Sequence, residues 1–226
     1  VSPMCMYSAE DGTIINTYLG LYGVDASSNG ENGVYVDINA DASTVYFELT
    51  ANYLTADDND EDGLQIDVDV ENGGYASAYS YATYSSFSDN GDDGADIDLG
   101  ADGVDSTIYA GFYFGNSTMD GNDDDGVYFG NTASGDTTAY IYSSLVIGYS
   151  SVSNNDGDGI DTDVEGTDGA NINVFVGVGF SNVDGNDFAD LQVAGYTQVG
   201  GAVPAPDLLF MGSETGFAEE ASARIA

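Results

Sequence analysis

The sequence predicts an all-β fold, a parallel β-helix (β-solenoid) of about six coils of about 31 residues each, with a short C-terminal capping helix. Three observations predict it: an acidic turn that recurs along the chain, an asparagine at a fixed place in each turn, and apolar residues that alternate in the same register. The chain has 226 residues, 42% of them hydrophobic, which is enough to bury a core of this kind.

The recurring unit is an acidic turn that contains Asn, followed by a glycine and a segment of alternating residues. It reads SSNGENGVYVDI in the first copy and DDNDEDGLQIDV in the second. A fixed period of this length is typical of proteins in which repeats stack on one another. The glycine anchors are Gly33, Gly63, Gly94, Gly126 and Gly159, and Asp190 takes the glycine place in a weaker copy, so successive anchors are 30, 31, 32, 33 and 31 residues apart.

An asparagine stands four residues before every anchor. Asn tolerates the left-handed backbone conformation and bonds within its own turn. Side-chain amides stacked at the spacing of adjacent strands can also bond the amides above and below. We therefore expect a ladder formed by Asn29, Asn59, Asn90, Asn122, Asn155 and Asn186.

Apolar residues before and after the turn keep the same register, and period-two alternation places them on one side of each strand. Because one coil cannot bury its own inner side, neighbouring coils must stack. The expected inward columns include Leu19, Leu49, Ser80, Phe112, Leu145 and Val176 at one position and Leu21, Ala51, Ala82, Phe114, Ile147 and Val178 at another.

The coil length, the Asn ladder and the aliphatic columns resemble the right-handed parallel β-helix family typified by pectate lyases and phage tailspikes. The resemblance covers about residues 14–200. It implies the architecture alone and carries no activity with it. A β-sandwich would also have short strands and frequent turns, but it does not require an in-register period near 31 residues.

The two ends of the chain depart from the repeat. We expect an N-terminal cap or assembly segment at 1–13, the solenoid at 14–202, and a C-terminal cap or assembly segment at 203–226. Phe217, Ala221 and Ile225 would share one face of a short helix, with Ser213 as its N-cap. The lone Cys5 cannot form an internal disulfide, and we expect a buried or inert thiol.

The charge excludes several classes of partner and chemistry. The chain has forty acidic residues and a single basic one, Arg224, so its net charge is −39. Binding to nucleic acid needs clusters of Lys or Arg, and anionic membrane surfaces also attract basic segments. The chain contains no apolar run near 18 residues, so we expect no membrane insertion. It has no His, which removes the Ser-His-Asp and Cys-His arrangements, and we expect no enzyme.

Aspartates recur in register with the anchors, and stacked carboxylates about 4.8 Å apart repel one another. Bound divalent cations, high salt or protonation would relieve this, and calcium is the natural divalent choice. The turn 58–63 matches the D-x-D-x-D-G start of a calcium loop, although Asp69 stands where an EF-hand has Glu, and a solvated acidic turn is the alternative. The candidate ligands are Asp37, Asp67, Asp98 and Asp163 after the anchors, and Asp58, Asp60, Asp62, Asp156 and Asp158 within the turns.

Three functions fit these features. The first is an extracellular or cell-surface structural protein, an acidic, cation-stabilised subunit that assembles with itself into a filament, surface layer or matrix. The second is a carbohydrate-binding or adhesive domain, in which outward tyrosines such as Tyr46, Tyr109 and Tyr142 would stack on polysaccharide. The third is a tailspike-like glycosidase, which needs only two carboxylates.

Overall fold

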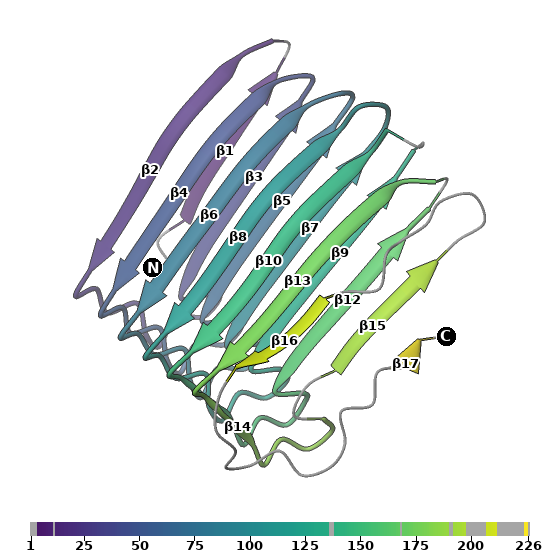
Figure 1. The fold of residues 1–226 in the computed structure, drawn as a ribbon. Coiled ribbons are helices and arrows are strands. Elements are labelled where there is room, and N and C mark those ends of the chain that lie inside the picture. Colours follow the sequence, from purple (N-terminus) through teal and green to yellow (C-terminus); the bar gives the residue numbers. More distant parts are fainter. Residues whose placement is uncertain are drawn as a thin grey trace.

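The computed structural model describes residues 4–10, 12–135, 138–167, 169–189, 192–197, 207–211 and 224–225. They form a parallel β-solenoid of about six coils, in which each coil places one strand in each of two long sheets (Figure 1). Neighbouring strands pair in parallel throughout both sheets. The predicted fold class is therefore confirmed.

The two long sheets lie on opposite sides of the core (Figure 1). Sheet A contains, in spatial order, β1 (Met4–Glu10), β3 (Val34–Asp41), β5 (Leu64–Glu71), β7 (Ala95–Asp102), β9 (Val127–Ser134), β12 (Ile160–Gly166), β15 (Gln192–Thr197) and β17 (Arg224–Ile225). Sheet B runs from β2 (Ile14–Tyr22) through β4 (Thr44–Asn52), β6 (Tyr75–Thr83), β8 (Thr107–Gly115), β10 (Tyr140–Gly148) and β13 (Asn171–Gly179) to β16 (Asp207–Met211).

A narrow third side closes each coil. There, β11 (Ser151–Ser153) pairs with β14 (Asn182–Asp184). Isolated parallel bridges continue this side toward the first coil, through Thr118, Ser86 and Thr55 to Asp25. The acidic turns lie between this third side and the next strand of sheet A, which places their carboxylates at one edge of that sheet.

The anchor glycines are required because the chain is crowded where each strand of sheet A begins. A Cβ atom added to Gly63 would lie 2.7 Å from the carbonyl oxygen of Gly94 and 2.9 Å from Nδ2 of Asn90. Both atoms belong to the next coil, so a side chain at the anchor would push two coils apart.

The core consists of the inward columns that the sequence predicts. Leu49, Phe112 and Phe114 from sheet B and Leu64 and Ile66 from sheet A are all completely or almost completely buried. Alternation turns every second residue inward, and the stacked coils then bury these side chains against one another. The first coil is the exception, because its inward residues Leu19 and Leu21 are only half-buried.

The predicted asparagine ladder is also present. The Nδ2 group of each asparagine donates to Oδ1 of the next, with distances of 3.0, 2.9, 3.1, 2.9 and 2.8 Å from Asn29 to Asn186. The same Oδ1 atoms accept a second hydrogen bond from the backbone N–H of the preceding asparagine. Each amide therefore joins two coils and satisfies a buried backbone donor.

The structure describes the two ends of the chain only in part. β1 pairs with β3, so residues 4–10 extend sheet A by one strand, and Cys5 on this strand is a half-buried free thiol. The capping helix falls mainly on residues 212–223, outside the described residues, and so does the anchor Asp190; the described Ile225 belongs to β17. Within the described residues, no helix is both long and apolar enough to cross a membrane.

Candidate functional site: an acidic ladder along sheet A

A column of buried aspartates lies at the point where each acidic turn enters sheet A. The Oδ1 atom of each accepts a hydrogen bond from the backbone N–H at the same place in the next coil. The distances are 3.0 Å from Asp93 N to Asp62, 2.8 Å from Asp125 N to Asp93, and 2.6 Å from Asp158 N to Asp125. These four aspartates are only 6–9% exposed. We call this column the aspartate ladder.

Burial changes the protonation of this ladder. Burial, together with a smaller contribution from neighbouring carboxylates, raises the pKa of Asp62 to about 7, that of Asp93 to about 9 and that of Asp125 to about 7. The hydrogen bonds from the backbone act in the opposite direction, but they do not offset the loss of hydration. The pKa of Asp158 is raised for the same reason. Near neutral pH the ladder therefore takes up protons or requires a counter-cation.

A second set of acids lies beside the ladder, on the outward side of β5 and β7. Burial raises the pKa of Asp96 to about 8, with Asp98 and Asp62 adding repulsion. The Oδ1 atom of Asp96 is buried and has no hydrogen-bond partner. Asp67 is better satisfied, because the Tyr35 hydroxyl donates to its Oδ2 atom at 2.8 Å. An unpaired carboxylate oxygen in a buried place is costly unless a proton or a cation neutralises it.

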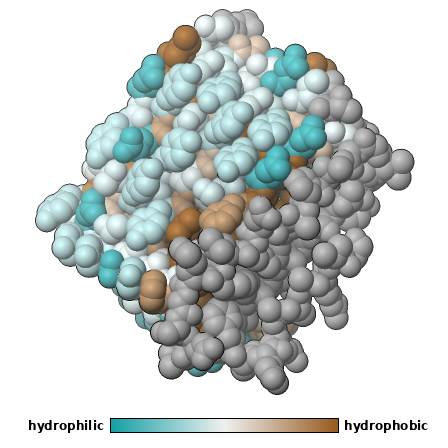
Figure 2. Space-filling model, viewed as in Figure 1, coloured by the Kyte–Doolittle hydropathy of each residue, from teal (hydrophilic) through white to brown (hydrophobic). Residues whose placement is uncertain are grey.

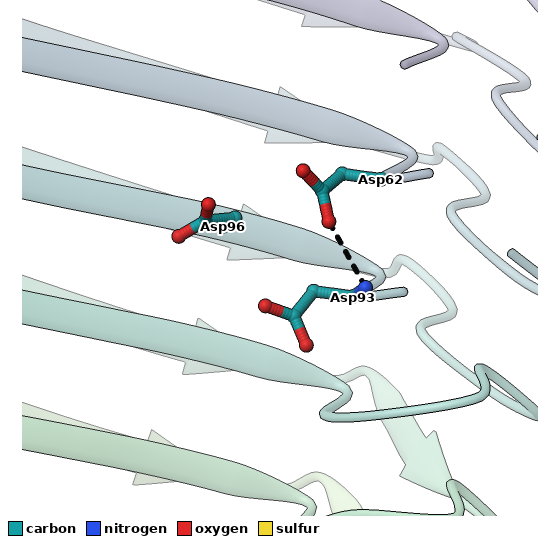
Figure 3. A group of neighbouring side chains, drawn as sticks. All are labelled: Asp62, Asp93 and Asp96. Carbon is teal, nitrogen blue, oxygen red and sulfur yellow. Dashed lines mark hydrogen bonds between the residues drawn. The ribbon is translucent and has the colours of Figure 1, made fainter. Parts of the chain in front are cut away.

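In the part of the chain that the structure describes, three groups of carboxylates bring their oxygens within 4.8 Å of one another. Asp96 belongs to two of them, and in one it lies beside Asp62 and Asp93, which come from two successive turns (Figure 3). Carboxylate oxygens from several residues are the ligands that Ca²⁺ takes in flexible geometry. The groups are Asp62 with Asp93 and Asp96, Asp67 with Asp96 and Asp98, and Asp92 with Asp93 and Asp124.

An open groove continues this acidic surface toward the later coils. Asp93, Asp96, Asp125 and Asp158 line it, and Tyr128 forms part of its wall. Because these coils repeat the same position at the spacing of adjacent strands, the groove presents a row of similar oxygen sites. Its charge suits small cations and repels anionic ligands.

The structure brings together some of the ligands that the sequence predicts and leaves others apart. Asp62, Asp67 and Asp98 belong to the three groups. The groups form between coils and not within one turn, so the calcium-loop pattern of 58–63 does not gather its own acids into any of them. Asp58 and Asp60 are exposed on that turn. The predicted ligands outside the three groups are Asp37, Asp58, Asp60, Asp156, Asp158 and Asp163.

Four members of the groups were not among the predicted ligands: Asp92, Asp93, Asp96 and Asp124. Two signals in the sequence could have found some of them. Asp93 stands one residue before its anchor, as Asp62 does, so the repeat alone stacks these two acids. Asp96 stands two residues after its anchor, and alternation gives it the same outward direction as Asp98.

The outer side of sheet B carries little charge, in contrast to the acidic outer side of sheet A. The strands β2, β4, β6, β8, β10 and β13 contain one charged residue, Glu48. Register places Tyr46, Tyr109 and Tyr142 in one column, as predicted. Figure 2 views this side, where aromatic rings lie in rows over the strands. We call this surface the tyrosine face.

Comparison with protein-family models, with curated proteins and with solved structures finds no match for this chain.

Proposed function

We propose that this chain is a structural protein outside the cell or on its surface, a subunit that assembles head to tail with copies of itself into a filament, layer or matrix. The edge strand β2 supports this most directly. It is nine residues long, IINTYLGLY, with no charged residue and no proline, in a chain of net charge −39. Proteins commonly protect sheet edges with charges or prolines, because free backbone N–H and C=O groups pair with other chains.

The core below this edge strand is incompletely covered. Leu19 and Leu21 point inward but are only half-buried. Their register partners one coil further, Leu49 and Ala51, are completely buried. Another coil stacked on β2 would bury the same apolar surface here, and this burial favours association.

The direction of the strands favours a head-to-tail contact. Both sheets are parallel throughout their described strands, so a neighbour added head to tail continues the same pairing. Such a contact joins two different surfaces and leaves one of each free, so it propagates into an open fibre. A head-to-head contact would pair two copies of β2 in antiparallel fashion and stop at a dimer.

Cations would control this assembly. Subunits of net charge −39 repel each other, and at physiological ionic strength salt screens that repulsion at distances beyond about 8 Å. We propose that Ca²⁺ bound by the groups around Asp96 neutralises part of the charge and stiffens the sheet. Extracellular calcium modules bind Ca²⁺ with Kd values of about 10⁻⁴–10⁻³ M.

A charged residue introduced at the incompletely covered end of the core tests whether subunits assemble head to tail. Leu19→Lys places a charge on the surface that a neighbour would cover, while Ser8→Lys adds the same charge at an exposed outward position of β1. We expect wild type and Ser8→Lys to form fibres or sheets on adding CaCl₂, by light scattering and negative-stain imaging, and Leu19→Lys to remain dispersed and folded. A wild-type protein that stays monomeric at high concentration under all cation and pH conditions would exclude the proposal.

Carbohydrate binding is the second candidate function, and the exposed tyrosines favour it. Tyr46, Tyr109 and Tyr142 are 38–50% exposed on a surface with little charge, as in platforms that stack on sugars. A glycan array probed with the dispersed Leu19→Lys protein separates the two functions. Binding that is lost in Tyr109→Ala would favour an adhesive domain over a structural subunit.

A further inference from the structure

We propose that the tyrosine face is the contact surface for a second copy of this chain, which packs against it face to face. This inference rests on the proposed function, because it assumes a self-associating subunit, but it concerns a different surface. The head-to-tail contact uses the end of the solenoid, whereas this contact uses its flank. Together they would join single fibres into pairs.

The distribution of charge supports this surface. Two subunits of net charge −39 can approach closely only where few carboxylates meet. Glu48 is the one charged residue in the six strands that form the tyrosine face, all of which the structure describes. The outward side of sheet A instead carries Asp67, Asp69 and Glu71 on a single strand. Among the two broad flanks, sheet B alone permits contact between identical copies.

The size of the face fits a stable interface between two proteins. Six strands at about 4.8 Å spacing and nine residues at about 3.3 Å each give a flat area of about 850 Å². A standard interface buries about 800 Å² on each partner. Two sheets that pack face to face lie about 10 Å apart, a distance that side chains the size of tyrosine fill.

The side chains of the tyrosine face can pack against an identical surface. A tyrosine supplies an apolar ring and a hydroxyl that both donates and accepts hydrogen bonds, so two identical tyrosine surfaces are complementary. The rings are already ordered by their neighbours. The centroid distances are 5.8 Å from Tyr46 to Tyr75, 5.9 Å from Tyr75 to Tyr109 and 5.9 Å from Tyr109 to Tyr140. Ordering them on association therefore costs little conformational entropy.

The same ring contacts favour a second copy over a neutral polysaccharide. Sugars stack on free ring faces, but rings along this side of the solenoid pack against rings of the next coil. Within the face the packed rings are tilted, by 52° for Tyr46 and Tyr75 and by 39° for Tyr75 and Tyr109. Just beyond the strand ends, Tyr53 and Tyr84 stack with centroids 5.3 Å apart and planes 14° from parallel. The rings of the face therefore partly cover one another, which leaves less ring surface free to stack on a sugar.

Glu48 also selects the orientation of the pair. It lies in the middle of β4, the second strand of the face. If the two solenoids ran parallel about a two-fold axis along their length, both copies of Glu48 would meet in a dry interface. In the antiparallel arrangement they are separated by three strand spacings, about 14 Å, in the plane of the sheets. At this separation the two charges repel several times less than in direct contact, because the Coulomb energy falls as the distance grows.

The test uses the Leu19→Lys protein, in which head-to-tail growth is blocked and only the flank contact remains. Sedimentation equilibrium in CaCl₂ should show a monomer–dimer equilibrium. We expect Tyr109→Glu and Tyr142→Glu, at two exposed positions of the face, to weaken the dimer at least about tenfold. Thr132→Glu adds the same charge at an exposed outward position of sheet A and should leave the dimer intact. Tyr109→Phe should also retain it.

The outcomes separate this inference from the proposed function. A protein that remains monomeric in the Leu19→Lys background, or a dimer that survives both tyrosine substitutions, overturns the flank contact. If fibres of the otherwise unchanged protein still form in Tyr109→Glu, the structural function stands without it. Binding of soluble cellulose derivatives or amylose by the monomer, lost in Tyr109→Glu, would assign the face to carbohydrate instead. Glu48→Gln should raise the dimer affinity, because it removes an unpaired carboxylate from the interface, and an unchanged affinity would show that Glu48 lies outside the contact.

Discussion

The Oδ1 atom of Asp62 accepts a hydrogen bond of 3.0 Å from the backbone N–H of Asp93, one coil further along. In the coil before, the Oδ1 atom of Asn32 does the same for the N–H of Asp62 at 2.9 Å. A neutral amide therefore fulfils the structural requirement of this position. The later coils nevertheless use a carboxylic acid that is buried and surrounded by other acids, so the backbone hydrogen bond alone does not account for an acid here.

The first prediction concerns pH. The pKa of Asp93 is about 9 in the folded chain and about 3.9 in an unfolded one, so the folded state binds more protons between these values. Stability is thus fully present below about pH 4, and it falls as pH rises toward about 9 in metal-free buffer. We expect Asp93→Asn, which keeps the Oδ1 acceptor, to flatten this dependence and to raise the melting temperature at pH 8 by about 3–6 °C.

Thermal melts in chelator between pH 4 and 9 measure this effect. Asp58→Asn removes one carboxylate from the exposed part of a turn and serves as the control. Its curve should keep the slope of the wild type. If Asp93→Asn and wild type fall in parallel as pH rises, the ladder is not the source of the pH dependence.

The second prediction concerns calcium. Asp96 belongs to two of the three carboxylate groups, and its Oδ1 atom is buried without a partner. A cation that binds only the folded state stabilises it by about 2.7 kcal/mol at a concentration one hundred times its Kd. We expect CaCl₂ to raise the melting temperature at pH 8 by about 5–10 °C, and Asp96→Asn to remove most of that rise. Asp60→Asn, outside the groups, should retain it, and a wild type indifferent to both calcium and chelator would contradict a metal role.

The sequence predicts those parts of the structure that depend on the repeat alone. The Asn ladder and the inward columns follow from residues that recur in register. Register also places the polar Ser80 correctly in the inward column of Leu49 and Phe112, where its hydroxyl is buried without a partner.

The carboxylate groups combine acids at different positions of two coils, and the repeat aligns only acids at the same position, such as Asp62 and Asp93. The pattern of 58–63 suggests a calcium loop, but in the solenoid Asp58 adopts a left-handed backbone, with φ of 55°, and the groups form across coils.

The third prediction tests which side of β8 faces the core. The Phe112 ring is 2% exposed and packs edge-on against Phe129 of the opposite sheet, with centroids 5.7 Å apart. Phe112→Ala should cost about 3–5 kcal/mol, since it leaves a cavity between the two sheets. Tyr113→Ala, on the outward side, should cost much less when measured by chemical denaturation of dilute protein. Equal losses of unfolding free energy in the two variants would contradict the assignment of Phe112 to the inward side and Tyr113 to the outward side of β8.

The last prediction concerns the amide ladder. The Oδ1 atom of Asn90 accepts hydrogen bonds from the backbone N–H and from Nδ2 of Asn59, at 3.1 and 2.9 Å, and its own Nδ2 group donates to Asn122 at 3.1 Å. Asn90→Ala leaves the two donors of Asn59 unpaired in a buried place, and each costs about 1–3 kcal/mol. We therefore expect a loss of about 3–5 kcal/mol in denaturant unfolding. Asn29→Ala, at the part-buried first position of the ladder, should cost less.

Asn90→Asp separates the amide ladder from simple packing. It has nearly the same shape and keeps an acceptor for Asn59, but when ionised it lacks the donor for Asn122 and buries a charge. A protonated carboxylic acid at this position regains one donor. Asn90→Asp should therefore be strongly destabilised at pH 8 and recover much of its stability near pH 4, whereas the deficit of Asn90→Ala relative to wild type should not change with pH. If the two variants respond to pH alike, the ladder stabilises the coils through contact and not through its hydrogen bonds.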